Sequence, residues 1–404
     1  MPGPLSGIRV ADFTWVWAGP TCTMQLAHMG AEVIRMETTN RICTLRMLPP
    51  WHGGGPNPNK AGYFNQYSQG KRGILLNIAD PEGAEIAKKL VAMSDVAVEN
   101  FAAGVMKKLG LDYEQLVKVK PDLVMMSMSG YGQYGPESAY VSYGPAQVPM
   151  SGLSQLTGYK DMHPMHVGMS YGDPNAGLHA AFAVIAALFH RERTGKGQYI
   201  DMSQWESSMA VIGEAFMNHE MNREQPERNG NRTDRMSPHG QFMAAGDDAW
   251  ISIVCTDDQD WKALCDVMEK PELADDARFK TLADRKANED ELEMVIMEWT
   301  LQHDPFEATV KLQARGIAAY PPLSSKQVLS NEHMEGRGFF VDKPAGAVEE
   351  PVRHAGIPWR LSETPAEVWR GAPAMGQDNE YVYGELLGYS SQQIADLAER
   401  GIIR

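Results

Sequence analysis

The sequence predicts an α/β protein in which helices cover both faces of a mostly parallel sheet, with a smaller α+β domain beside it. The first observation is that short apolar runs alternate with helical patterns through the first third of the chain. The second is composition: the 404 residues are 43% hydrophobic and 22% charged, as is typical of a globular protein. The third is a polar stretch with Gly and Pro at 218–240, which is typical of a linker between domains.

Two periodicities predict the elements of the first part. Short, continuous apolar runs predict buried strands, and longer stretches with apolar residues three or four positions apart predict helices. The helix at 81–93 has proline in its first turn, where the missing N–H costs nothing. In chain order we expect strands at 8–13, 31–36, 74–77, 95–99 and 123–128, and helices at 20–29, 81–93, 105–109 and 113–118.

The remainder combines a loop, a long helix and a second unit. Residues 41–59 contain Pro-Pro and WHGGGPNPN, which predict a long surface loop; loops of that length are usually functional or mobile. A strong helix is expected at 172–190. From 241 to 326 a second unit is expected, followed by loops. Its strand pair is expected near 242–254 and its helices at 258–268, 284–299 and 305–315, and a last helix is expected at 391–400.

Charge and cysteine content exclude several classes of function. The net charge of −15 argues against nonspecific binding to nucleic acid or an anionic membrane, both of which need a basic face. The four cysteines are scattered, without metal-ligand spacing, which favours a reducing compartment and no metal site. The start of the chain lacks a signal-peptide pattern, and the longest apolar run, 176–189, is shorter than the roughly 20 residues of a membrane span. We therefore expect a cytoplasmic protein.

Two glycine-containing strings resemble known motifs, but their surroundings argue against those motifs. The GxGxxG string at 130–135 follows a strand, but a dinucleotide site needs a helix directly afterwards, and here Pro136 and a Tyr-rich stretch follow. A turn is the better interpretation. HGGG at 52–55 and GxSxG around Ser170 are strings found in serine hydrolases. A nucleophile elbow leads directly into its helix, whereas here we expect the helix to begin four residues after Ser170.

Asp173 stands at the start of the long helix and has two interpretations, which are compatible with each other. As the N-cap, with Pro174 at the first helical position, it stabilises the helix by about 1 kcal/mol. As a carboxylate fixed at a helix start, it is kept ionised by the helix dipole and can act as a nucleophile. Spare backbone N–H groups could then stabilise an oxyanion.

Basic residues are paired at two loop ends of the first domain. Lys71-Arg72 precedes an expected strand, and Lys107-Lys108 follows Asn100 and Phe101. Solvated surface charge is the simpler interpretation. In a chain with a net charge of −15, however, two such pairs also suggest a polyphosphate ligand.

Six segments across nearly the whole chain resemble the class III CoA-transferase family, typified by formyl-CoA transferase and carnitine CoA-transferase. This resemblance implies a large Rossmann-like domain made of both termini, a smaller α+β domain, and two chains interlocked as a dimer. We therefore expect the large CoA-binding domain at 1–217 and 327–404, a linker at 218–240 and the small domain at 241–326. The segments that carry the resemblance are 5–37, 71–83, 98–116, 127–136, 171–207 and 387–397.

The resemblance also implies a mechanism and its residues. The family's catalytic aspartate falls on Asp173, which attacks an acyl-CoA thioester and then carries CoA as an aspartyl thioester until an acceptor carboxylate takes it. CoA is thus a substrate, and no tightly bound cofactor is expected. The phosphates of CoA are expected near the Lys71-Arg72 pair. The implied CoA contacts are Val16, Arg72, Asn100, Phe101, Val105, Lys108 and Leu109.

This chain departs from formyl-CoA transferase at several implied site positions. A glutamine near that enzyme's active site falls on Trp17, an adenine-contacting arginine on Thr38 and a glutamate on Gly144. In that enzyme a tetraglycine loop covers the aspartyl intermediate, and residues 237–240 stand in its place here. Formyl-CoA and oxalate are therefore doubtful as substrates. We expect a larger and more aromatic acceptor pocket, lined by Trp17, Tyr143, His239 and Gly240.

Three functions follow from these features. The first is CoA transfer from a donor such as succinyl-CoA to an aromatic or substituted dicarboxylic acid such as benzylsuccinate, because succinyl-CoA:benzylsuccinate CoA-transferase subunits are similar. The second is a 2-methylacyl-CoA racemase or epimerase of the same fold. Such racemases use a histidine and an aspartate as acid and base, but the histidine position falls on Tyr143 here, which leaves the pair incomplete. The third is a non-catalytic CoA-binding subunit, against which Asp173 argues. A homodimer or a heterodimer with a related subunit is expected.

Overall fold

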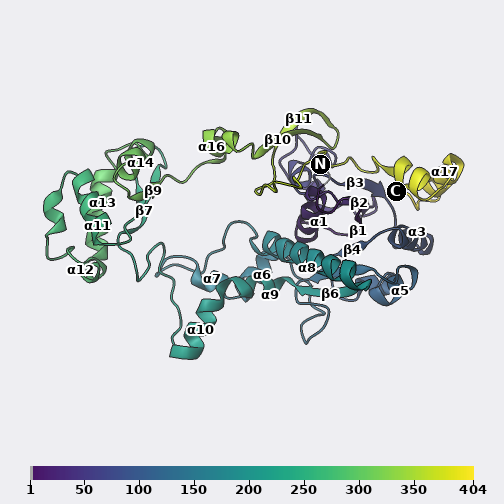
Figure 1. Ribbon diagram of the computed structural model, residues 1–404, viewed down its shortest axis with the longest axis horizontal. Coiled ribbons are helices and arrows are strands. Elements are labelled where there is room, and N and C mark those ends of the chain that lie inside the picture. The colour runs from purple at the N-terminus through teal and green to yellow at the C-terminus, as the bar shows by residue number, and fades with distance from the viewer. Residues whose placement is uncertain (1–2) are drawn as a thin grey trace. The chain divides into compact units, whose positions relative to one another are not determined.

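The computed structural model describes residues 3–404, which form two compact units (Figure 1). Unit 1 is made of both ends of the chain: it runs to Ser154 and continues through His166–Gln225 and His333–Arg404. Unit 2 comprises Gln155–Met165 and Pro226–Glu332. The sequence placed 155–165 in the large domain, but the structure assigns this segment to unit 2. The longer segment of unit 2 begins at Pro226, inside the expected linker at 218–240.

Unit 1 is built around a six-stranded parallel sheet, which confirms the predicted fold class. The strand order is β3-β2-β1-β4-β5-β6, so the order along the sheet reverses between β1 and β4. The sequence missed β6, whose polar and apolar residues alternate, unlike the continuous runs of the buried strands. The strands are β1 (Arg9–Asp12), β2 (Glu32–Glu37), β3 (Arg72–Leu75), β4 (Val96–Glu99), β5 (Val124–Ser129) and β6 (Gln198–Ser203).

Helices cover both faces of this sheet because alternate strand residues point to opposite sides. Val10 and Val96 face one core, with α1 (Ala18–His28) and α8 (Gly172–Thr194) packed over them. Ala11 and Ala97 face the other core. That second core is covered by α3 (Pro81–Ala92), α5 (Tyr113–Val119), η4 (Glu380–Leu386) and α17 (Ser391–Glu399).

Close packing of α8 against α1 brings the start of α8 next to the β1–α1 connection. A Cβ atom at Gly177 would lie 2.7 Å from the carbonyl oxygen of Ala18 and 2.7 Å from Cβ of Thr21, so no larger residue fits there. The two helices therefore touch through backbone. This contact fixes the first turn of α8 relative to the carboxyl end of β1.

Unit 2 has its own antiparallel sheet and core. β7 (His239–Met243), β8 (Trp250–Val254) and β9 (Ala318–Tyr320) form the sheet. The single helix expected at 284–299 is two helices, because Asn288 ends one and begins the next. The helices are α11 (Asp258–Val267), η3 (Pro271–Ala274), α12 (Leu282–Ala287), α13 (Glu289–Thr300) and α14 (Pro305–Gln313).

Shorter elements complete the described chain. No helix in residues 3–404 is long and apolar enough to cross a membrane. The helix α10 (Gly213–Asn222) extends into 218–240, the stretch that was expected to be a linker. This helix was not predicted because its sequence carries few apolar residues. The remaining elements are η1 (Thr44–Met47), α2 (Gly62–Tyr67), α4 (Val105–Lys108), α6 (Gly144–Met150), α7 (Leu153–Leu156), α9 (Gln204–Met209), η2 (Ala210–Ile212), α10 (Gly213–Asn222), α15 (Ser325–Leu329), α16 (Glu332–Gly336), β10 (Phe340–Ala345) and β11 (Val348–Ala355).

Candidate active site

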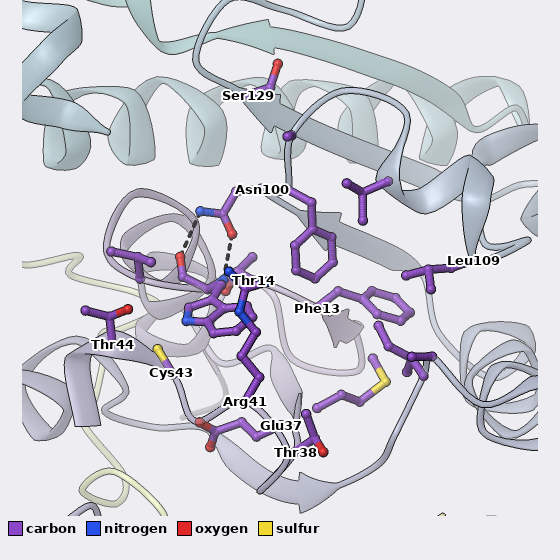
Figure 2. Close-up of a pocket in the computed structure, with 18 of the residues that line it drawn as sticks. Phe13, Thr14, Glu37, Thr38, Arg41, Cys43, Thr44, Asn100, Leu109 and Ser129 are labelled. Atoms are coloured by element: carbon purple, nitrogen blue, oxygen red, sulfur yellow. Dashed lines mark hydrogen bonds between the residues drawn. The ribbon is translucent and has the colours of Figure 1, made fainter. Parts of the chain in front are cut away.

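A cavity of about 810 Å³ opens at the carboxyl ends of the strands of unit 1. Ligands of open α/β sheets bind where the strand order reverses, which is between β1 and β4 here. The cavity is lined by the segments that follow these two strands, and also by residues that follow β2 and β5 (Figure 2). Its volume suits a ligand of drug size or larger.

The turn after β1 is strained and is held by an asparagine. Val16 has φ +56°, a left-handed conformation that a β-branched residue rarely adopts and that costs about 1–3 kcal/mol. Asn100, which follows β4, donates to the carbonyl oxygen of Trp15 at 2.8 Å and accepts from its N–H at 2.6 Å (Figure 2). Its amide thus joins the two strand ends across the reversal point. Both Val16 and Asn100 line the cavity.

A buried ion pair at the end of β1 supports this turn. Lys71 Nζ lies 3.3 Å from Asp12 Oδ2 and donates to Thr23 Oγ1 at 2.7 Å. The other oxygen of Asp12 accepts from the backbone N–H of Thr14 at 2.8 Å. Burial lowers the pKa of Lys71 to about 8, against the attraction of Asp12. Since Lys71 is 0% exposed and paired with Asp12, its ammonium group is not available to contact the phosphates of a ligand.

Five of the seven predicted CoA contacts lie together on the cavity wall, and two do not. Arg72 lies outside the wall, on β3, where it pairs with Glu32 at 3.0 Å and Asp378 at 3.4 Å. Lys108 is exposed on α4 and also lies outside the wall. The five that the structure brings together are Val16, Asn100, Phe101, Val105 and Leu109.

Glu99 supports the same wall from inside the sheet. Its carboxylate accepts from the backbone N–H of Phe101 at 2.7 Å, which shapes the segment after β4. Burial raises the pKa of Glu99 to about 7, although bonds from Ser127 and Phe101 lower it. This role was not predicted, because Glu99 ends an otherwise ordinary buried strand.

Asp173 lies on the cavity wall, in the first turn of α8. Its expected role as N-cap is wrong: the helix begins at Gly172 with Tyr171 as the capping residue, and no side chain caps it. The carboxylate instead accepts a hydrogen bond from Ser170 Oγ at 2.6 Å. Burial raises the pKa of Asp173 to about 6, and the bond from Ser170 opposes that rise. The group is therefore mostly ionised at neutral pH.

Gly144 leaves room for that carboxylate. A Cβ atom built on Gly144, at the start of α6, would lie 2.3 Å from Asp173 Oδ2 and 1.9 Å from Ser170 Oγ. The backbone of this glycine therefore packs directly against the pair. The neighbouring Tyr143 lies on the cavity wall and is 58% exposed.

An aromatic cluster lies next to Asp173. Trp17 is not on the cavity wall but packs against Tyr63 and Tyr67 of α2, with ring centroids 5.3 and 5.2 Å away. Burial, Tyr67 and the charge of Asp173 all raise the pKa of Tyr63, so this phenol lies near the carboxylate. Neither tyrosine was predicted to belong to the site. Their spacing of four residues, which places two side chains on one helix face, was the available signal.

Arg41 is a further residue of the site that the sequence did not predict. It is exposed, lines the cavity, and its guanidinium stacks 4.5 Å above the Trp15 ring. Thr38, where the family's adenine-contacting arginine falls, also lines the cavity. The cavity thus has an exposed cation, Arg41, three positions further along the chain. The predicted pocket residues His239 and Gly240 lie on β7, in unit 2.

Comparisons with known proteins show which family the chain is similar to. Residues 5–379 match CoA-transferase family III. The chain is 33% identical to succinate–glutarate CoA-transferase of Agrobacterium fabrum, over 95% of this chain and 96% of that protein. It is 32% identical to succinyl-CoA:mesaconate CoA-transferase of Haloarcula marismortui, over 93% of this chain and 94% of that protein. A CaiB/BaiF family protein from Brucella suis superposes with a TM-score of 0.88 at 30% identity, covering 96% of this chain and all of that one.

Proposed function

Because the chain belongs to CoA-transferase family III and is a CoA-transferase, we propose that it moves CoA from succinyl-CoA to a dicarboxylic acid through a covalent intermediate on Asp173. Both relatives named above transfer CoA between succinate and another dicarboxylic acid, by their names. The observation that carries the proposal is a buried, mostly ionised carboxylate on the wall of a cavity large enough for an acyl-CoA. The acceptor is a substituted dicarboxylic acid, with benzylsuccinate among the candidates.

The chemistry balances without water or an added cofactor. An oxygen of Asp173 attacks the thioester carbonyl, and the CoA thiolate leaves to give a mixed anhydride. The thiolate then attacks the aspartyl carbonyl and releases the donor acid, which leaves CoA on Asp173 as a thioester. The acceptor carboxylate attacks that thioester, which forms a second mixed anhydride and releases the CoA thiolate. The thiolate then attacks the acceptor's carbonyl carbon in this anhydride and forms the new acyl-CoA. Asp173 is regenerated as a carboxylate.

The surroundings of Asp173 suit this sequence. At 9% exposure the carboxylate is largely shielded from water, which would otherwise hydrolyse the anhydride and the thioester. Its pKa of about 6 leaves it ionised at neutral pH. The position in the first turn of a 23-residue helix also favours negative charge there.

A CoA ligand in this cavity would lie against the segment after β4 and reach the cation at its rim. Arg41→Ala should weaken CoA binding about tenfold, because an exposed guanidinium can pair with a phosphate or stack on adenine. Calorimetric titration at low and moderate salt measures this. Lys118→Ala, which removes an exposed cation on α5, is the matched control. Lys108→Ala should have a smaller effect than Arg41→Ala, and the opposite ranking would move the phosphates to α4.

The aromatic cluster is proposed to select the acceptor acid. Trp17→Gln should reduce the preference for bulky or aromatic acids over succinate roughly tenfold, because it replaces a large apolar face with an amide. The measurement is the ratio of kcat/KM for a benzyl-substituted and an unsubstituted dicarboxylic acid. Trp250→Gln in unit 2 is the control. An unchanged ratio would show that the cluster is structural.

Two assays separate this proposal from its alternatives. A racemase exchanges the α-hydrogen of an acyl-CoA with deuterium from the solvent, whereas a transferase does not. Incubating the chain with succinyl-CoA and a panel of dicarboxylic acids should give new acyl-CoA products and no α-deuterium. A non-catalytic subunit would give no product until a partner is added.

We also propose that the chain acts as a dimer, with itself or with a related subunit. Leu178, Phe182 and Phe189 are 51%, 76% and 59% exposed and lie on one face of α8. Large apolar side chains gathered on one face are typical of an interaction surface. Light scattering on the purified chain, alone and after co-expression with a related subunit, distinguishes the two forms.

A further inference from the structure

The GxSxG string at 168–172 has a chemical role that differs from that of a hydrolase elbow. Its serine, Ser170, is 5% exposed and donates to Asp173 Oδ2 at 2.6 Å. The backbone N–H of Asp173 also donates to the carbonyl oxygen of Ser170 at 3.3 Å. One side-chain and one backbone hydrogen bond therefore hold the turn from 170 to 173. Helix α8 begins two residues after Ser170, not four as the sequence predicted. No hydrogen bond to a histidine is found for this serine in residues 3–404.

We propose that Ser170 is a positioning residue for the nucleophile: its hydroxyl holds Oδ2 of Asp173 and presents Oδ1 to the thioester. This inference rests on the proposed covalent function of Asp173. Asp173 lines the cavity whereas Ser170 does not, so the serine stands behind the carboxylate. A serine in that place can fix the orientation of the carboxylate without competing for the substrate.

The backbone of Gly144 packs against both Ser170 and Asp173. Because a Cβ at 144 would lie 1.9 Å from Ser170 Oγ and 2.3 Å from Asp173 Oδ2, the backbone there confines both groups. The carboxylate therefore has little freedom to rotate while the hydrogen bond exists. Without the hydroxyl, a gap would open behind Oδ2, and the carboxylate could turn away from the attacking geometry. Small losses of orientation at reacting atoms cost large factors in rate.

The hydroxyl also keeps the nucleophile ionised. Burial raises the pKa of Asp173, and the bond from Ser170 is the interaction that opposes it. The charge of Asp173 contributes to a raised pKa of Tyr63 on α2, so this phenol stays neutral near pH 7. Within residues 3–404 no ion pair involves Asp173. Removing the hydroxyl should therefore raise the pKa of Asp173, and the acid limb of the pH–rate profile should move to higher pH.

The test is the pH profile of Ser170→Ala and Ser170→Thr, with Ser94→Ala as the control. Ser94 is also buried, donates to the backbone carbonyl oxygen of Leu90 in α3, and does not line the cavity. We expect Ser170→Ala to lower kcat roughly 10- to 100-fold. Its KM for acyl-CoA should change less than about threefold, and its acid limb should rise by about one pH unit. Ser170→Thr keeps the hydroxyl, so the acid limb of its pH–rate profile should lie at the wild-type pH.

Other outcomes separate this inference from the function beneath it. An unshifted acid limb with a full kcat in a folded Ser170→Ala variant would overturn the positioning role while Asp173 remained essential. If Ser170→Thr shows the same raised limb as Ser170→Ala, the hydroxyl is not the cause, and the inference also fails. If Asp173→Asn is active and an acyl group is found on Ser170, the proposed function itself fails, and the serine is the nucleophile.

Discussion

Replacing Asp173 with asparagine should lower turnover by several orders of magnitude while the protein stays folded. The amide is a poor nucleophile toward a carbonyl carbon, so neither the anhydride nor the aspartyl thioester can form. Its oxygen can still accept the hydrogen bond from Ser170, so the local geometry should persist. CoA affinity should change little, because the cavity wall after β1 and β4 is untouched. Steady-state kinetics, CoA titration and thermal unfolding measure the three quantities.

A matched substitution separates chemistry from helix stability. Asp112 does cap its helix, α5, by accepting from the backbone N–H of Gln115. Because asparagine caps about as well as aspartate, Asp112→Asn should leave both stability and turnover close to wild type. Near wild-type turnover in Asp173→Asn would contradict the covalent mechanism. Mass spectrometry of that sample must first exclude deamidation of the asparagine back to aspartate.

Gly144→Ala should reduce kcat by about 100-fold or more, because the new methyl group overlaps Asp173 Oδ2 and Ser170 Oγ. At least one of the two side chains must move, and the nucleophile leaves its productive orientation. CoA binding should survive, since Gly144 lies at the start of α6 and not on the cavity wall. The signature is therefore a fall in kcat with an almost unchanged dissociation constant for CoA.

Gly336→Ala is the control for that substitution. Nothing lies within 4 Å of the Cβ position at Gly336, and its backbone is not in the left-handed region. An added methyl group there should be harmless. If Gly144→Ala keeps full kcat, the carboxylate has more freedom than the packing implies, and the confinement of Asp173 is contradicted.

The sequence predicted the fold well because the buried strands carry continuous apolar runs. It failed at β6, where polar residues interrupt the pattern, and at 284–299, where Asn288 breaks an otherwise continuous helical periodicity. It also placed residues 155–165 in the wrong unit, because contacts between distant segments leave no local pattern. Periodicity reports what a residue does within its own element and little about which element it packs against.

The candidate site was predicted unevenly for a similar reason. Asp173 was found, but its helix was expected to begin two residues later than it does, and the bond to Ser170 was missed. Two adjacent cations, Lys71 and Arg72, looked like a phosphate site, yet both are used in ion pairs within the fold. A pair of charges in a sequence does not reveal which carboxylates will meet it. The strained turn at Val16 is likewise invisible until the backbone is known.

The most direct test of the account is mass spectrometry of the chain after incubation with succinyl-CoA and no acceptor acid. We predict a CoA adduct on the peptide that contains Asp173, lost on addition of an acceptor dicarboxylic acid and absent from Asp173→Asn. Adduct loss should coincide with formation of the new acyl-CoA. Transfer of CoA without any adduct on Asp173, or with an acyl group on Ser170 instead, would contradict the account.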